Sequence, residues 1–157
     1  VSACPNHQTG RTTPFATRGA IASLGATGYE LDLTKLSEEE KEQVREQIEN
    51  YKQIDGLVLK GDLYRLADPF KGNYFCEMLV SKDKSKAYVV GERFRGVPCD
   101  HDRVLKLRGL DEGKTYTVKE LNVTASGAAL MGAGLFCPRL SDCGSWVWHI
   151  GEVCKKG

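Results

Sequence analysis

The sequence lacks a marked excess of charge of either sign, and it lacks a long apolar run. Its 157 residues carry 22 basic and 21 acidic side chains, which gives a formal net charge of +1. Proteins that bind nucleic acid usually carry a clear basic patch. A helix that crosses a membrane needs about 20 consecutive apolar residues. We therefore expect neither a nucleic-acid partner nor a membrane partner.

Closely spaced cysteine pairs are also missing, although the chain contains six cysteines. These are Cys4, Cys76, Cys99, Cys137, Cys143 and Cys154. The last three and His149 come nearest to a metal-ligand set, but five, five and four residues separate them. Structural zinc sites usually contain a tighter CxxC-type pair. We expect free or buried thiols, and neither a bound metal nor another cofactor.

The clearest helix signal begins near residue 37. Ser37 and Glu40 have the spacing of a capping box. Apolar side chains then recur at helical spacing, at Val44, Ile48 and Tyr51. Gly56 is the residue type that often follows a helix C-terminus. We predict an amphipathic helix over residues 37–55, preceded by a loop-rich stretch in which residues 20–24 could be helix or strand.

From residue 57 onward the pattern changes to short strands separated by turns. The candidate strands are Leu57–Lys60, Leu63–Leu66, Tyr74–Ser81, Ala87–Phe94, Arg103–Arg108, Thr115–Leu121 and Trp146–Ile150. Short strands without intervening helices are typical of an antiparallel sandwich or barrel. The pattern predicts one all-β domain over residues 57–150 and a fold that is mostly β.

Several motifs follow one another along the chain. They are Ser2-Ala3-Cys4-Pro5-Asn6-His7-Gln8, Gly28-Tyr29-Glu30-Leu31-Asp32-Leu33, Gly61-Asp62-Leu63-Tyr64-Arg65-Leu66, Asp68-Pro69-Phe70, Leu107-Arg108-Gly109-Leu110-Asp111 and Met131-Gly132-Ala133-Gly134-Leu135. In this order they closely resemble the C-terminal part of the α-galactosidases of glycoside hydrolase family 36. The resemblance covers about residues 1–150, and it implies that the chain is the tail of a larger enzyme.

The resemblance also implies a division into domains. In these enzymes a (β/α)8 barrel carries the active site, and an antiparallel β-domain follows it. Residues 1–56 would be the C-terminal end of that barrel, with the loop after its last strand and its final helix. Residues 57–150 would be the C-terminal antiparallel β-sandwich, and residues 151–157 a short tail.

The catalytic groups of such an enzyme are expected outside this chain. Retaining glycosidases need two carboxylates about 5–5.5 Å apart. By resemblance these are two aspartates on barrel strands, in motifs that lie upstream of residues 2–8. We expect no catalytic residue in this chain and no hydrolase activity from the chain alone.

Other carboxylates have simpler interpretations. Asp100 and Asp102 flank His101 in a segment that we interpret as a solvated turn. Glu77 and Glu92 lie inside apolar strand runs, where outward-facing positions would explain both.

Asn6, His7 and Gln8 are the candidates for substrate contact. Barrel enzymes place their binding groups in the loops that follow the strands, and amide and imidazole groups can bind sugar hydroxyls. The alternative is that these side chains hold the loop and cap the adjacent helix. Arg11 and Arg18 could equally be structural, pairing with carboxylates at the junction between the barrel and the sandwich.

Trp146 and Trp148 lie two residues apart on a predicted strand, hence on one face. Exposed on that face, the two rings could form a sugar-stacking platform. The alternative is that they belong to the core or to the seam with a neighbouring domain. Their accessibility to solvent distinguishes the two cases.

The sequence thus predicts the C-terminal segment of a cytoplasmic, bacterial-type retaining α-galactosidase. By resemblance, the whole enzyme acts on terminal α-D-galactosyl residues of melibiose- or raffinose-like oligosaccharides, and relatives are often homotetramers. The segment itself would be structural. One alternative is a carbohydrate-binding module, which requires exposed aromatic residues. The other is a structural or interaction domain without a ligand, which would show a buried tryptophan pair and an exposed apolar patch.

Overall fold

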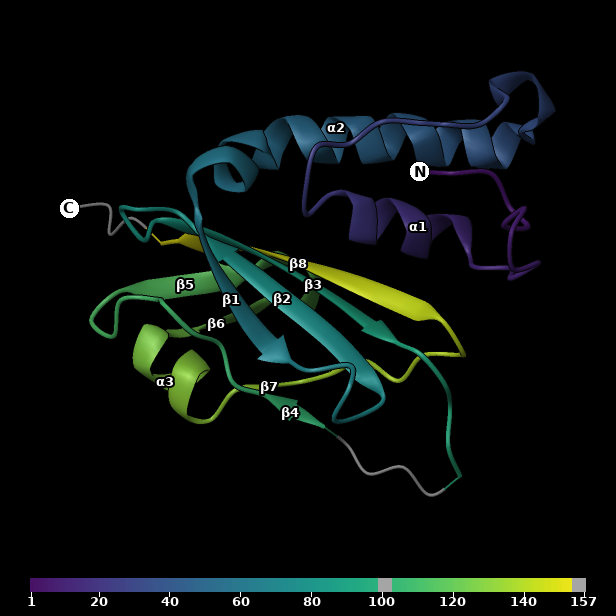
Figure 1. The fold of residues 1–157 in the computed structure, drawn as a ribbon. Coiled ribbons are helices and arrows are strands. Elements are labelled where there is room, and N and C mark those ends of the chain that lie inside the picture. Colours follow the sequence, from purple (N-terminus) through teal and green to yellow (C-terminus); the bar gives the residue numbers. More distant parts are fainter. Residues whose placement is uncertain (99–102, 154–157) are drawn as a thin grey trace.

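The computed structural model describes residues 1–98 and 103–153, and Figure 1 shows their arrangement as a ribbon. The helices in these ranges are α1 (Phe15–Ala22), α2 (Glu38–Lys60) and α3 (Gly127–Gly132), with short 3-10 helices η1 (Leu33–Lys35) and η2 (Lys119–Leu121). The strands are β1 (Asp62–Ala67), β2 (Tyr74–Val80), β3 (Lys86–Arg93), β4 (Val104–Leu105), β5 (Thr115–Val118), β6 (Val123–Ser126), β7 (Leu135–Phe136) and β8 (Gly144–Glu152).

The centre of the molecule is a six-stranded antiparallel sheet with the order β1-β2-β3-β8-β5-β6. Its longest pairing joins β3 to β8, from Lys86 opposite Gly151 to Arg93 opposite Gly144. A separate two-stranded sheet pairs β4 with β7. The chain is therefore mostly antiparallel β with few helices, as the sequence predicted.

Both faces of the central strands are covered. Side chains alternate between the faces of a strand, so β2 and β3 send Met78 and Val89 to one face and Leu79 and Tyr88 to the other. The first face packs under β4, β7 and α3, and the second under α1 and α2 (Figure 1). Burial on both sides explains why these strands read as nearly continuous apolar runs.

Helix α2 begins where the sequence predicted but extends beyond the predicted end. Ser37 Oγ accepts a hydrogen bond from the Glu40 N–H at 3.1 Å, and Glu40 Oε2 accepts one from the Ser37 N–H at 3.0 Å. The helix then continues through Gly56 to Lys60. The predicted end at residue 55 and the predicted strand Leu57–Lys60 are wrong, because Leu57 extends the buried side of the helix onto the sheet.

The remaining strand predictions succeed where pairing is long. Strands β1, β2, β3 and β8 were all predicted, and each predicted end lies within two residues of the observed one. The predicted strand Arg103–Arg108 shortens to two residues, and the end of Thr115–Leu121 becomes η2. Residues 20–24, left open between helix and strand, contain the end of α1. Elements β6, β7 and α3 were not expected.

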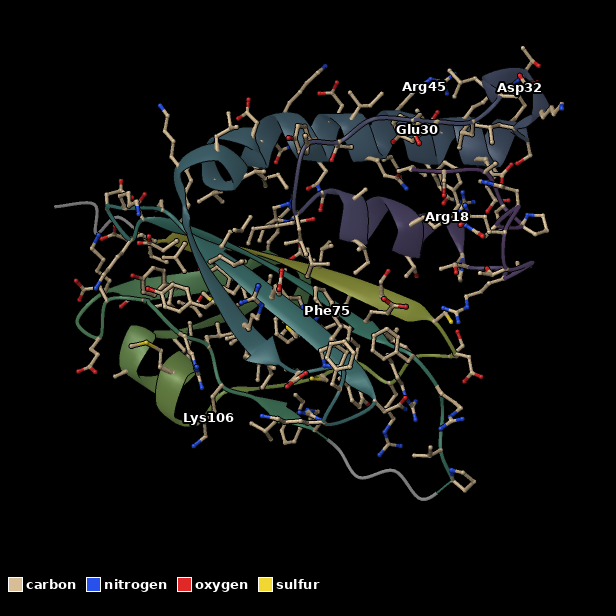
Figure 2. The ribbon with its side chains drawn as sticks, viewed as in Figure 1. Arg18, Glu30, Asp32, Arg45, Phe75 and Lys106 are labelled. Carbon is tan, nitrogen blue, oxygen red and sulfur yellow. The ribbon has the colours of Figure 1, made fainter. Side chains whose placement is uncertain are left out.

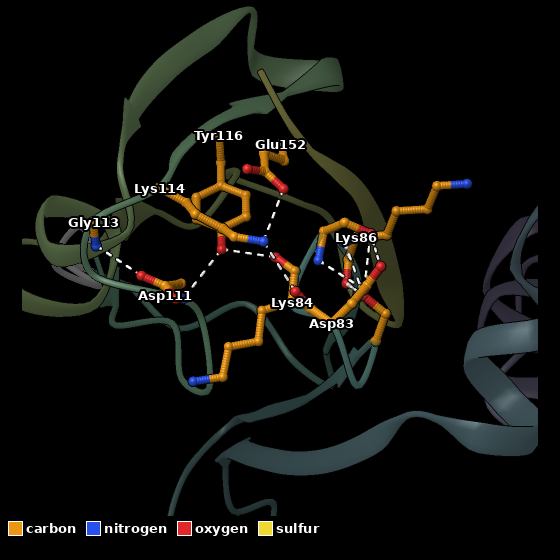
Figure 3. A network of polar contacts seen from close by, with 10 residues as sticks. Asp83, Lys84, Lys86, Asp111, Gly113, Lys114, Tyr116 and Glu152 are labelled. Carbon is orange, nitrogen blue, oxygen red and sulfur yellow. Dashed lines mark hydrogen bonds and ion pairs between the residues drawn. The ribbon is translucent and has the colours of Figure 1, made fainter. Parts of the chain in front are cut away.

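One corner of the sheet is fixed by a network of polar contacts (Figure 3). The Tyr116 hydroxyl donates to the carbonyl oxygen of Lys84 at 2.8 Å and accepts from the Asp111 N–H at 3.1 Å. Lys114 Nζ donates to the carbonyl oxygen of Asp83 at 3.0 Å and to Glu152 at 2.9 Å. Strand β5 and the segments around it therefore hold the β2–β3 turn in place.

Candidate functional site

The loop that contains Asn6, His7 and Gln8 is shaped by Asn6. Its Oδ1 atom accepts hydrogen bonds from the backbone N–H groups of Gln8 and Thr9, each at 3.0 Å. Its own backbone N–H donates to the carbonyl oxygen of Arg11 at 2.9 Å. This is the behaviour expected of an Asx turn. Asn6 therefore holds the loop, while His7 and Gln8 are exposed on it.

Arg18, on α1, fastens both ends of this loop. Its Nε atom donates to the carbonyl oxygen of Thr13 at 3.2 Å, and its Nη1 atom donates to the carbonyl oxygen of Ser2. The guanidinium also lies 4.8 Å from the centre of the Phe15 ring. The planar, forked arginine group suits this double contact. Arg18 is thus a structural clamp, although its contacts are to carbonyl groups and not to the carboxylates considered above.

A second loop lies at the same end of the molecule. It runs through η1 to the start of α2, and Asp32 Oδ1 accepts from the Thr34 N–H at 3.0 Å and from the Thr34 hydroxyl at 2.6 Å. Figure 2 shows Asp32 near the beginning of α2 and Arg18 beside the first loop. These capping contacts explain the local structure. Residues 28–33 carry part of the family resemblance, but no residue of this loop was predicted to contact substrate.

A parallel backbone bridge places the two loops together. Ser2 and Glu30 form this bridge, and the Glu30 N–H donates to the carbonyl oxygen of Val1 at 2.9 Å. Each bridged segment leads into a loop and then into a helix, α1 or α2. Since parallel segments end on the same side, the loop with His7 and the loop with Asp32 share one edge.

Beside these loops lies an open cavity of about 910 Å³. Its charged lining residues are Arg11, Arg18, Glu30, Glu92 and Arg95. Burial raises the pKa of the Glu92 carboxyl, and the nearby Arg11 guanidinium opposes that rise. The cavity therefore combines three guanidinium groups with two carboxyl groups.

A hydrogen bond fixes α1 against the β-sheet next to this cavity. The Thr17 hydroxyl donates to the carbonyl oxygen of Cys143 at 2.7 Å, and the Thr17 side chain is buried. Cys143 directly precedes β8. The position of the first loop is thus tied to the sheet as well as to α1.

Trp146 and Trp148 do lie on one face of β8, but that face is covered. Their exposed fractions are 7% and 1%, and their ring centres are 6.0 Å apart. Tyr74 packs edge-on against Trp146 with 6.3 Å between the ring centres. No ring face is open to a sugar at this position, so the sugar-stacking interpretation is wrong and the core interpretation holds.

The other candidate residues have structural surroundings or lie outside the described residues. Glu77 pairs with Arg65 of the adjacent strand, with 3.3 Å between Oε1 and Nε. Asp100, His101 and Asp102 lie outside the described ranges, as do Cys99 and Cys154. Within residues 1–98 and 103–153, His, Cys, Asp and Glu side chains form no cluster of three or more that could hold a metal ion. No helix in those ranges is long and apolar enough to cross a membrane.

Two family models match successive parts of the chain. Residues 1–61 match the melibiase family, and residues 74–150 match the C-terminal domain of glycosyl hydrolase family 36. The fold and the two matches together assign the chain to a family of glycosyl hydrolases. The chain belongs to glycoside hydrolase family 36 and corresponds to its C-terminal part.

Individual relatives agree along almost the whole chain. Alpha-galactosidase AgaA of Geobacillus stearothermophilus is 43% identical over 154 residues, which is 98% of this chain and 21% of AgaA. The bifunctional alpha-galactosidase/sucrose kinase AgaSK of Mediterraneibacter gnavus is 42% identical over 90% of this chain and 15% of its own length. Alpha-galactosidase 2 of Hypocrea jecorina is 37% identical over 86% of this chain and 18% of its own length. The chain thus spans about a fifth or less of these relatives.

Solved structures agree equally well. The galactosidase domain of AgaSK superposes with a TM-score of 0.94 at 40% identity, over 98% of this chain and 21% of that one. A variant of AgaA in complex with 1-deoxygalactonojirimycin gives the same TM-score at 42% identity, over the same shares of the two chains. Other AgaA structures contain raffinose or stachyose.

Proposed function

We propose that this chain is the C-terminal part of a retaining α-galactosidase. The whole enzyme would hydrolyse terminal α-D-galactosyl residues of galacto-oligosaccharides such as melibiose and raffinose, without a metal or other cofactor. The observation that carries the proposal is the similarity to α-galactosidases along 98% of the chain, including AgaA, which was solved with raffinose and stachyose.

Residues 1–60 would complete the catalytic barrel. The parallel bridge between Ser2 and Glu30, with α1 after the first segment and α2 after the second, supports two consecutive β-α units. Barrel enzymes bind substrate at the C-terminal ends of their strands. The loop with His7 and Gln8 and the loop with Asp32 would lie there, so His7 and Gln8 are our candidates for sugar contact while Asn6 shapes the loop.

The rest of the barrel would supply the chemistry. Retention requires a nucleophilic carboxylate and an acid/base carboxyl about 5–5.5 Å apart. In this proposal both come from the preceding part of the longer protein, and the 157-residue chain alone does not turn over substrate. The cavity with Glu92 and the arginines would face that preceding part.

The β-domain of residues 62–152 would support the barrel and subunit contacts as a sandwich-type layer. Exposed apolar side chains of this domain favour such contacts: Phe70 is 97% exposed and Phe136 66%. The buried tryptophan pair is also what a structural domain without a ligand requires, whereas a carbohydrate-binding module needs open rings. We further propose a homo-oligomer in the cytoplasm.

A chimaeric enzyme tests the proposal. The C-terminal fifth of AgaA is replaced by this chain, and hydrolysis of an aryl α-galactoside and of raffinose is measured. We expect substantial activity from the chimaera, and none from AgaA truncated at the same point or from this chain alone. A folded but inactive chimaera, or turnover by the isolated chain, would contradict the proposed division of labour.

A further inference from the structure

A chain of polar side chains connects five elements on the helix-covered face of the sheet. Its members are Ser23 after α1, Tyr88 on β3, Asn50 on α2, His149 on β8 and Glu120 on η2. We call these five residues the polar chain. It crosses the seam between residues matched by the melibiase family and residues matched by the C-terminal domain family.

The direction of the first hydrogen bonds follows from one carbonyl group. Ser23 Oγ lies 2.7 Å from the carbonyl oxygen of Ala20, which can only accept, so the single hydroxyl proton of Ser23 is used there. Tyr88, 3.1 Å from Ser23 Oγ, must then donate to Ser23. Burial raises the pKa of the Tyr88 hydroxyl, so it keeps the proton that this donation needs.

The same count fixes the orientation of the Asn50 amide. The only hydrogen of the Tyr88 hydroxyl is used in its bond to Ser23. In the 3.0 Å contact with Asn50, the donor must therefore be Asn50 Nδ2. The Oδ1 atom of Asn50 is left facing His149 Nε2 at 2.5 Å. Two acceptors at that distance would repel each other, so His149 Nε2 carries a proton.

The other ring nitrogen of His149 faces a carboxylate. Nδ1 lies 2.6 Å from Glu120 Oε1, and Glu120 Oε2 accepts from the backbone N–H of His149 at 2.8 Å. The side chains of His149 and Glu120 are 25% and 31% exposed, so water reaches the Glu120 carboxylate. An ionised Glu120 makes Nδ1 a donor as well.

We propose that the folded chain holds His149 as the doubly protonated imidazolium, and that its proton latches α2 to the sheet. Loss of the proton leaves a bare ring nitrogen facing either Asn50 Oδ1 or Glu120. The polar chain can adapt only by flipping the Asn50 amide and reversing Tyr88 and Ser23. That reversal removes the donor from the carbonyl oxygen of Ala20. The latch is therefore sensitive to pH.

Other charged groups surround His149 without replacing this contact. A cavity of about 700 Å³ is lined by His149 together with Lys52 of α2, Lys86 of β3, Lys119 of η2 and Glu152 of β8. Glu152 is engaged by Lys114 at 2.9 Å. The Tyr88 ring packs on the imidazole with 5.0 Å between their centres. The lysines oppose the positive ring, whereas Glu120 and the Asn50 carbonyl group favour it.

The sign of the pH effect follows from proton binding. In the proposal the folded state keeps a proton that an unfolded histidine releases as the pH rises, so the contribution of the latch to stability is present at lower pH and is lost as the pH rises. Docking of α2 on β8 should therefore weaken from pH 6 towards pH 9.

Nuclear magnetic resonance of the ring nitrogens tests the protonation state directly. In the 157-residue chain at pH 7, we expect both nitrogens of His149 to carry protons, with the signals assigned by their loss in His149→Gln. Ser23→Ala removes the hydroxyl that orients the polar chain, and we expect it to lower the protonated fraction at least threefold at the pH where the wild type is half protonated. Ser145→Ala, on the same strand as His149, is the control and should change nothing.

Two results of the magnetic resonance experiment would overturn the proposal. One is a ring nitrogen of His149 without a proton at pH 7, and the other is an unchanged protonated fraction in Ser23→Ala. Tyr88→Phe is a second variant in case Ser23→Ala does not fold. It removes the hydroxyl that accepts from Asn50 Nδ2, and so it releases the amide that contacts His149. As a second readout, the difference in denaturant midpoint between wild type and His149→Gln should shrink between pH 6 and pH 9. A difference in midpoint that stays constant from pH 6 to pH 9 would mean that the contact of His149 with α2 does not depend on the proton, which contradicts the latch.

Discussion

The backbone N–H of Glu30 donates a hydrogen bond to the carbonyl oxygen of Val1 at 2.9 Å, beside the parallel bridge that joins Ser2 to Glu30. Parallel segments need a long crossover, which is usually helical, and α1 lies in this one. The N-terminal part therefore contains two segments that are each followed by a helix, where the sequence suggested one loop and one helix. This pairing places the candidate loops on one edge.

Arg18→Lys should loosen the first loop. Lysine keeps the charge, but its single ammonium group lacks the planar fork with which the arginine side chain donates to both carbonyl oxygens, of Ser2 and of Thr13. We expect a loss of about 1–3 kcal/mol in the free energy of unfolding, measured by denaturant titration. Arg45→Lys is the matched control, because Arg45 pairs with Glu42 on the exposed side of α2 and should cost less than about 0.5 kcal/mol. Equal effects of the two changes would refute the clamp.

Gly56→Ala should stabilise the chain. Gly56 lies inside α2, and a Cβ atom there would meet nothing within 4 Å. Alanine is favoured over glycine in an exposed helix interior by about 0.5–1 kcal/mol. The gain is measured as a rise in the denaturant midpoint. A loss of stability would instead mean that the helix ends at Gly56, as the sequence first suggested.

Gly91→Ala should disrupt the tryptophan core. A Cβ atom at Gly91 would lie 2.0 Å from Cζ2 of Trp146, on the paired strand. Overpacking of this kind typically costs about 1–3 kcal/mol. Thermal unfolding followed by tryptophan fluorescence measures it. Gly151→Ala is a suitable control, since nothing lies within 4 Å of its Cβ position; similar losses from both would speak against close packing at Trp146.

Asp83 should add stability that disappears in acid. Its Oδ1 atom accepts from the Ser81 hydroxyl at 2.6 Å and from the Ser85 N–H at 3.0 Å. These bonds lower the pKa of Asp83 from 3.8 to about 2. A lowered carboxyl pKa means that the stabilisation is complete above the unfolded value and is lost as the pH falls towards about 2.

The comparison of wild type with Asp83→Asn checks this effect. Thermal unfolding midpoints should differ at pH 6 and converge as the pH approaches 2. Asp55→Asn, on the exposed surface of α2, serves as the control for a general charge effect. A difference between wild type and Asp83→Asn that stays constant down to pH 2 would contradict the assigned role of these hydrogen bonds.

The elements that could be predicted from the sequence are those determined by residues close together in the chain. The capping box of Ser37 and Glu40 predicted the start of α2, and long apolar runs predicted β2, β3 and β8. The end of α2 was missed because tertiary packing of Leu57 outweighs the low helix propensity of Gly56. Strand β7 was missed because two paired residues leave no periodic pattern.

The candidate site was predictable only in part. The motif around Asn6 predicted sugar contact by Asn6, His7 and Gln8, which stays a prediction. The alternative role, that of holding the loop, is what the Asn6 hydrogen bonds show. The clamp role of Arg18 and the neighbouring loop at Asp32 depend on contacts across the bridge between Ser2 and Glu30, which are 28 residues apart. Burial of the tryptophan pair likewise depends on β4, β7 and α3 covering the sheet.

Whether this chain is the C-terminal part of a larger α-galactosidase can be decided from the intact mass of the native polypeptide that carries the sequence. The mass is measured on material purified by α-galactosidase activity. We expect a protein several times larger than the 17.3 kDa of this chain, with these residues at its C-terminal side. A native polypeptide of about 17.3 kDa, or α-galactosidase activity that separates from this sequence, would refute the proposed function.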